Sequence, residues 1–150
     1  MFENVARAWI NDLRTTKTLQ GHSFLSQVRD GKFYDCCLGR LCKLALASKV
    51  EIDVSKQDMP LEKMAVIRFG DDLSFIPERV KQWANLRDKS GYVSLPACYD
   101  EDGEINTMLR EWTNVDPVNR SVSFSLDALN DDGLTFAQIA DLIEEFWEVL

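Results

Sequence analysis

Residues 34–44, "YDCCLGRLCKL", decide how this chain folds, because three cysteines fall within seven positions of a largely apolar run. An apolar stripe at helical spacing predicts a helix over 36–48, formed by Cys37, Leu41, Leu44 and Ala45 and edged by Leu38 and Cys42. Gly39 lies inside this helix, where glycine costs about 1 kcal/mol relative to alanine. We therefore expect another segment to approach Gly39 closely, which would place this helix in the core.

The cysteines could instead form a metal or redox site. The chain has four cysteines and one histidine, with no C-x-x-C pair, whereas a structural zinc site needs about four ligands, usually in close pairs. Buried cysteine packs as a small apolar residue. We therefore interpret Cys36, Cys37 and Cys42 as core residues and predict no metal and no cofactor. A reactive thiolate stays open as an alternative, because it needs a basic neighbour and Arg40 and Lys43 are near in sequence.

Outside this stretch, the periodicity predicts an α+β fold in a single globular domain over 1–150. About four main helices, starting near residues 3, 36, 77 and 135, would pack on a small sheet that we expect to be antiparallel. The strand candidates are 50–55 and 64–70, with a short hairpin turning at Asp30 and Gly31. Thr135 and Gln138 form a capping-box pattern at the start of the last helix. The segment 88–123 has no clear pattern, and its acidic turn "DEDGE", 100–104, lacks the spacing of a calcium loop.

Charge and hydropathy narrow the classes of function. The chain carries a formal net charge of -8, which repels a phosphate backbone and disfavours direct nucleic-acid binding. No run reaches the roughly 18 apolar residues of a membrane span, and the first residues lack the pattern of a signal peptide. We therefore expect a cytoplasmic protein with reduced thiols that does not enter a membrane.

Four blocks of sequence occur in an order that resembles a known family. They are "WINDLRTTKTLQG" at 9–21, "YDCCLGRLC" at 34–42, "IPERVKQWANL" at 76–86 and "LDALNDDGLTFAQIADLIEE" at 126–145. This order resembles a family of small uncharacterised proteins of tailed phages and prophages, with C-C-L-G-x-L-C and L-N-D-x-G-x-x-F-x-x-I-A-D-x-I-E motifs. The resemblance implies a phage origin, a shared fold and a place in the cytoplasm of an infected cell. It implies no catalytic residues, and we assign none.

Two groups of polar residues are the candidate ligand-binding positions. Arg14, at the end of the first helix, and Lys17 and Gln20, which follow it, could bind an anion such as phosphate, or simply solvate a helix end. Asn130 and Asp131 precede Gly133 and could line a pocket, or form the turn that directs the last helix. His22, the sole histidine, could be a general base, but we interpret it as a surface residue. No metal ligand is predicted.

These observations leave three hypotheses for function, with catalysis uncertain and disfavoured. The first is a non-catalytic phage accessory protein that binds a host protein or a signalling molecule, such as a small anionic ligand, to counter host defence. The second is a small enzyme acting on a nucleotide or phosphorylated metabolite, with Arg14 and Lys17 on the anion and Asp131 as base. The third is an acidic inhibitor that mimics nucleic acid. The sequence gives neither the partner nor the oligomeric state.

Overall fold

The helix α2 (Cys37–Ala47) lies at the middle of the fold and connects most of its parts. The computed structural model describes residues 1–96, 114–116 and 121–150. Cys36 is the N-cap of α2, and its sulfur accepts a hydrogen bond from the backbone N–H of Gly39 at 3.3 Å. An added Cβ at Gly39 would meet the carbonyl oxygen of Leu25 at 1.6 Å. The expected close approach to Gly39 is therefore confirmed, and its partner is the backbone of Leu25.

The other helices surround α2 and share one hydrophobic cluster with it. They are α1 (Glu3–Thr15), α3 (Glu78–Ala84), α4 (Leu126–Asp131) and α5 (Phe136–Phe146), with a short 3-10 turn η1 (Pro60–Glu62). Trp9 of α1 is fully buried, and its indole N–H donates to the carbonyl of Cys37 at 3.0 Å. The apolar faces of α1 and α5 pack against each other, so that the first and last helices lie side by side.

A mixed five-stranded sheet forms one end of the molecule, in the order β1-β3-β2-β5-β4. Its strands are β1 (Leu19–Gln20), β2 (Ser26–Arg29), β3 (Lys32–Asp35), β4 (Val54–Met59) and β5 (Met64–Phe69). Among these described strands, only the β1–β3 pair is parallel. Asp30 and Gly31 both have positive φ and form the predicted turn between β2 and β3.

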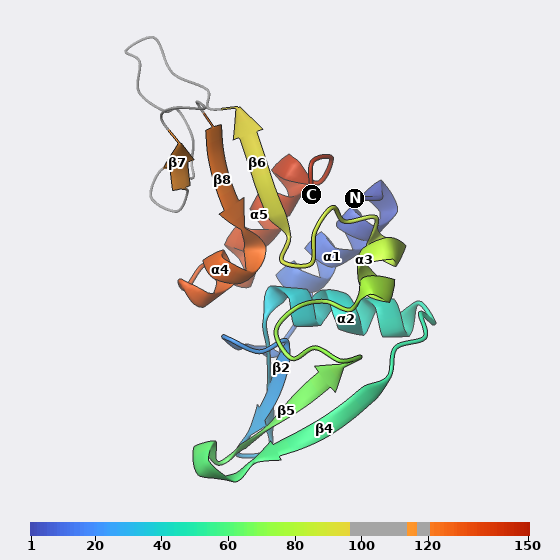
Figure 1. Ribbon diagram of the computed structural model, residues 1–150, viewed down its shortest axis with the longest axis vertical. Helices are drawn as coiled ribbons and strands as arrows, with labels where there is room; N and C mark the ends of the chain where they lie inside the picture. The colour runs from blue at the N-terminus through green and yellow to red at the C-terminus, as the bar shows by residue number, and fades with distance from the viewer. Residues whose placement is uncertain (97–113, 117–120) are drawn as a thin grey trace.

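A second, antiparallel sheet contains β6 (Tyr92–Pro96), β8 (Ser121–Ser125) and β7 (Asn114–Asp116), in the order β6-β8-β7. Figure 1 shows the two sheets at opposite ends of the molecule, with the helices between them. Val93 of β6 and Phe124 of β8 reach the same hydrophobic cluster as α2. The two sheets are thus joined through the helices.

The structure confirms the predicted α+β class and corrects several boundaries. The helices expected from 36, 77 and 135 begin one residue later, because Cys36, Pro77 and Thr135 are N-caps. The capping box of Thr135 and Gln138 is present. The strand expected at 50–55 is wrong in position, since β4 starts at Val54, where pairing with Phe69 begins. Cys98 and the turn 100–104 lie outside the described residues.

Candidate functional site

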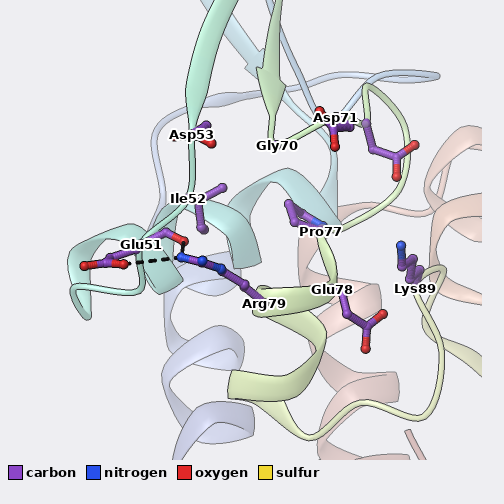
Figure 2. Close-up of a pocket in the computed structure, with 10 residues that line it drawn as sticks. Glu51, Ile52, Asp53, Gly70, Asp71, Pro77, Glu78, Arg79 and Lys89 are labelled. Atoms are coloured by element: carbon purple, nitrogen blue, oxygen red, sulfur yellow. Dashed lines mark hydrogen bonds and ion pairs between the residues drawn. The ribbon is translucent and has the colours of Figure 1, made fainter.

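A cavity lies where the open end of β4 and β5 meets the start of α3. Its volume is about 780 Å³. We call it the acidic groove, because five carboxylates and two cations are among its lining residues, which are Glu51, Ile52, Asp53, Gly70, Asp71, Asp72, Pro77, Glu78, Arg79 and Lys89. Figure 2 shows Asp53, Gly70 and Asp71 at the strand ends and Glu78 and Arg79 on the helix that faces them.

Local backbone geometry sets the walls of this groove. The N–H of Gly70 donates to the carbonyl of Asp53 at 2.7 Å, which holds the end of β5 beside the approach to β4. Gly70 has a φ of +62°, a conformation that favours glycine, and the chain then turns back toward Pro77 and α3. The acidic residues on either side of this turn are therefore brought to one opening.

The charges in the acidic groove are not balanced. The Nη1 atom of Arg79 donates to the backbone carbonyl of Glu51 at 3.1 Å and to its carboxylate at 3.3 Å, as the dashed line in Figure 2 marks. The side chain of Glu51 is nonetheless 91% exposed. Glu78 pairs with Lys81 on its own helix at 3.5 Å, which leaves Asp53, Asp71 and Asp72 to share the opening with Lys89. The groove therefore suits a positively charged ligand better than an anion.

Three of the predicted ligand-binding residues come together, but mainly to connect parts of the fold. Asn130 is fully buried, and its Oδ1 accepts from the Nε2 of Gln20 and from the N–H of Cys37, both at 3.1 Å. Its Nδ2 donates to the carbonyl of Gly21 at 2.8 Å and to the carboxylate of Asp131 at 3.3 Å. The side-chain amide of Asn130 is thus fully used within the protein.

Gln20 is engaged in the same way. Its Nε2 also donates to the carbonyl of Leu134 at 2.5 Å, and its Oε1 accepts from the N–H of Phe136 at 2.9 Å. Asp131 is exposed, and its carboxylate accepts from the N–H of Ser23 at 2.9 Å. We call these residues, Gln20, Asn130 and Asp131, the Asn130 cluster. It joins β1 and the loop after it to the turn between α4 and α5.

Arg14 and Lys17 lie apart from the Asn130 cluster. The Nη2 of Arg14 donates to Asp141 at 2.6 Å and to Glu144 at 2.7 Å on α5, and these hydrogen bonds, Glu144 first, raise the pKa of its guanidinium. Lys17 lines a shallow cavity of about 560 Å³ with Thr18, Leu19, Lys32 and Phe33. The cavity that Lys17 lines contains neither Arg14 nor Asp131, so these residues do not share one opening there.

The three cysteines of the central helix are buried, as predicted for core residues. Cys36, Cys37 and Cys42 are 5% exposed or less and occur as free thiols. Burial raises the pKa of the Cys36 thiol to about 12 and raises those of Cys37 and Cys42 well above the ordinary value. Cys37 donates through its sulfur to the carbonyl of Leu126 at 3.4 Å. Their environment therefore favours neutral thiols rather than nucleophilic thiolates.

The basic residues near these cysteines have other partners. Lys43 contacts both carboxylate oxygens of the fully buried Asp35 at 2.7 Å, and Arg40 contacts Asp35 at 3.1 Å and Asp12 at 2.6 Å. Hydrogen bonding to Asp12 and then Asp35, against the desolvation of the guanidinium, raises the pKa of Arg40. Arg40 and Lys43 thus neutralise a buried carboxylate.

The acidic groove was not predicted from the sequence, although a signal for it exists. Its carboxylates occur largely in two short segments, around 51–53 and 71–72, which flank the two strands of one hairpin. In the observed register Val54 pairs with Phe69, so the flanking residues must meet. When the strand is predicted at 50–55, residues 51–53 fall inside it, and the sequence does not indicate that they lie beside residues 71–72. Within the residues that the structure describes, no cluster of three or more His, Cys, Asp or Glu side chains has the geometry of a metal site.

The comparisons with known proteins give a family but no activity. The family described as "Domain of unknown function (DUF8296)" matches residues 1–147, so the chain belongs to this family. The expectation of an uncharacterised family spanning nearly the whole chain is thereby confirmed, while the phage origin stays a prediction. Neither the curated proteins nor the solved structures yielded a match. Among the described helices, none combines the length and the apolar character needed to cross a membrane.

Proposed function

We propose that this chain is a non-catalytic binding protein that engages a basic segment of a protein partner through the acidic groove. The observation that carries the proposal is the charge of this cavity, where Glu51, Asp53, Asp71, Asp72 and Glu78 face Arg79 and Lys89. A Lys- or Arg-rich segment would place its cations among these carboxylates. The formal net charge of -8 would steer such a partner toward the protein.

The resemblance of the four sequence blocks to phage proteins supplies the biological setting of the proposal. In that setting the partner is a host protein, the site of action is the cytoplasm of the infected cell, and binding would counter host defence by covering a functional basic surface. A basic surface on a host protein is often one that contacts nucleic acid. The acidic inhibitor that mimics nucleic acid is therefore a second candidate, and it would use the same groove.

The first experiment measures binding of a fluorescently labelled oligolysine peptide by anisotropy. We expect Asp53→Asn/Asp71→Asn to weaken binding at least about fivefold, because it removes two of the five groove carboxylates. The control Asp132→Asn/Glu145→Gln changes the net charge equally at exposed positions outside the groove and should change affinity less than about twofold. Equal losses in both variants would mean that the peptide senses only the overall charge, and the groove proposal would fail.

A second experiment connects the groove to a cellular partner. Affinity purification from host cells should recover a protein with the wild type and the control variant but not with Asp53→Asn/Asp71→Asn. Competition with duplex DNA separates the two candidates. A nucleic-acid mimic must be displaced from its partner by DNA, with affinity falling steeply as salt rises. A partner retained in the presence of excess DNA would exclude mimicry and leave the first candidate.

A small anionic ligand would bind at a different place. Lys17 and Lys32 line the shallow cavity with Leu19 and Phe33, which are 44% and 53% exposed. An anion with an apolar part could contact both lysines there. We rank this third, because the cavity is smaller than the acidic groove and Lys43 already lies over the Phe33 ring, 5.1 Å from its centroid.

A further inference from the structure

The outer edge of β4 is an exposed strand edge at one side of the five-stranded sheet. β4 is the last strand in the order β1-β3-β2-β5-β4, and Figure 1 shows it at the border of the lower sheet. In the part of the chain that the structure describes, no strand pairs with its outer side. Five of its six residues are exposed and none is proline, so its outward N–H and C=O groups can pair with another strand.

We propose that β4 pairs with β4 of a second copy, antiparallel and about a two-fold axis at Gln57. The two five-stranded sheets would then continue into one another across the dimer. The charges of β4 identify its partner as a second copy, because the charges of two antiparallel copies of this strand are complementary.

The complementarity of these charges depends on the register between the two copies of β4. With Gln57 opposite Gln57 of the second copy, Lys56 lies directly opposite Asp58 on both sides of the axis. Lys56 and Asp58 share one face of the sheet and already form an ion pair at 3.3 Å within one copy, with side chains 58% and 76% exposed. Side chains directly opposite in an antiparallel pair are about 5 Å apart at Cβ. Each lysine can therefore contact the aspartate of the other copy.

Neighbouring registers lack this complementarity. A two-fold axis perpendicular to the sheet leaves the side chains of both copies on their original faces. Residues directly opposite each other must share a face, so every allowed register places one residue opposite its own copy at the axis. An axis at Lys56 places two lysines directly opposite, and an axis at Asp58 places two aspartates opposite. Like charges directly opposite destabilise a strand pair. An axis at Gln57 is thus favoured by charge alone.

Two exposed apolar residues lie at the borders of the proposed pairing. Val54 at one end of β4 is 50% exposed, and Leu61, in η1 just beyond the other end, is 93% exposed. With the axis at Gln57, the extended register ends at Met59, opposite Ser55 of the second copy. Lysine commonly protects edge strands, but here Asp58 of the second copy neutralises it.

Charge reversal tests the pairing through sedimentation velocity over a dilution series. The wild type should dimerise, whereas Lys56→Glu alone and Asp58→Lys alone should each weaken the dimer at least about tenfold, because like charges then face each other twice. An equimolar mixture of the two variants should recover a heterodimer, since the new glutamate of one variant would then face the new lysine of the other. Lys49→Glu and Glu145→Lys, at exposed positions off the edge, are the matched controls and should behave as the wild type.

A cysteine pair tests the register in a Cys98→Ala background. Gln57→Cys should form an intermolecular disulfide under mild oxidation, because the two-fold axis places its two copies opposite one another. Ser55→Cys should not, since its copies would be roughly 13 Å apart along the strands. A wild type that stays monomeric, or single reversals that dimerise as the wild type does, would overturn the proposal. Equal cross-linking at both positions would overturn the register. Neither result affects the peptide experiment on the acidic groove.

Discussion

At the scale of single residues, Gly39 leaves less room for a side chain than any other described glycine. A Cβ at this position would lie 1.6 Å from the carbonyl oxygen and 2.6 Å from the carbonyl carbon of Leu25. The same carbonyl accepts a hydrogen bond from the N–H of Cys36 at 3.1 Å. The start of α2 is therefore fixed against the backbone that leads into β2, and no side chain fits between them.

We predict that Gly39→Ala destabilises the protein by at least about 3 kcal/mol, although alanine is the better helix former. The reason is that backbone atoms, rather than a movable side chain, occupy the space that the methyl group needs. Urea unfolding followed by circular dichroism measures the change. The control Gly31→Ala has no atom within 4 Å of the added Cβ, and its positive φ should cost only about 1 kcal/mol. A stabilised Gly39→Ala variant would contradict the contact.

The buried thiols give a second prediction at this scale. In a Cys98→Ala background, we expect Cys36, Cys37 and Cys42 to resist alkylation by iodoacetamide at pH 8 and to react fully in urea, because burial raises their pKa values and blocks access. Mass spectrometry measures the extent. The pKa of each buried thiol is higher in the folded state than in the unfolded state. Burial of the neutral thiols therefore contributes fully to stability below about pH 8.5, and this contribution decreases as the pH rises toward the pKa of the folded state. Alkylation of any of the three within minutes in the native state would contradict this account.

At the scale of elements, the features predicted correctly from the sequence are those that neighbouring residues determine. The capping box at Thr135 and the turn at Asp30 and Gly31 are short-range features, and both occur where the sequence indicates. The position of β4 could not be predicted in this way, because its residues are mostly exposed and only pairing with β5 fixes its limits.

The arrangement of the candidate residues likewise depends on tertiary contacts. The polar residues that precede Gly133 were recognised, but their partner Gln20 is 110 positions from Asn130 in the chain, and only the tertiary fold shows that they satisfy one another. The acidic groove likewise depends on a strand register. Arg14 lies at a helix end, as the sequence indicates, but the carboxylates it meets belong to α5.

We predict that Asn130→Ala costs about 3 kcal/mol of unfolding free energy, because it leaves the N–H of Cys37 and the carbonyl of Gly21 without partners. The loss should appear in chemical denaturation without loss of oligolysine binding, since the Asn130 cluster is separate from the acidic groove. Asp132→Ala, two positions along and exposed, is the control and should change stability by less than about 0.5 kcal/mol. A neutral Asn130→Ala would indicate that the cluster does not support the fold.

At the scale of the whole molecule, the helices are the connection between two sheets that do not pair with each other in the described residues. α5 is central to this connection, because it packs on α1 and contributes Ile139, Ala140 and Ile143 to the core without exposure. Phe146, just past these residues, contacts Phe124 of β8 with ring centroids 5.7 Å apart. Removal of this helix should therefore affect both ends of the molecule.

We predict that a chain ending at residue 133 shows no cooperative urea transition by tryptophan fluorescence. It would lose the buried residues of α5 and expose the face of α1 that carries Val5, Trp9 and Leu13. Ala137→Ser, at an exposed position of α5, should retain the transition and serves as the control. A sharp transition in the shortened chain would show that the remaining elements fold without α5.

The packing of α1 on α5 also affects how the protein is made. Because α1 is translated first and its partner helix is complete only after some 130 further codons (Thr15 to Phe146), the apolar face of α1 stays uncovered during most of synthesis. Ribosome-bound intermediates of this protein therefore expose an apolar surface that chaperones bind. The packing of α1 can be completed only once α5 has left the exit tunnel.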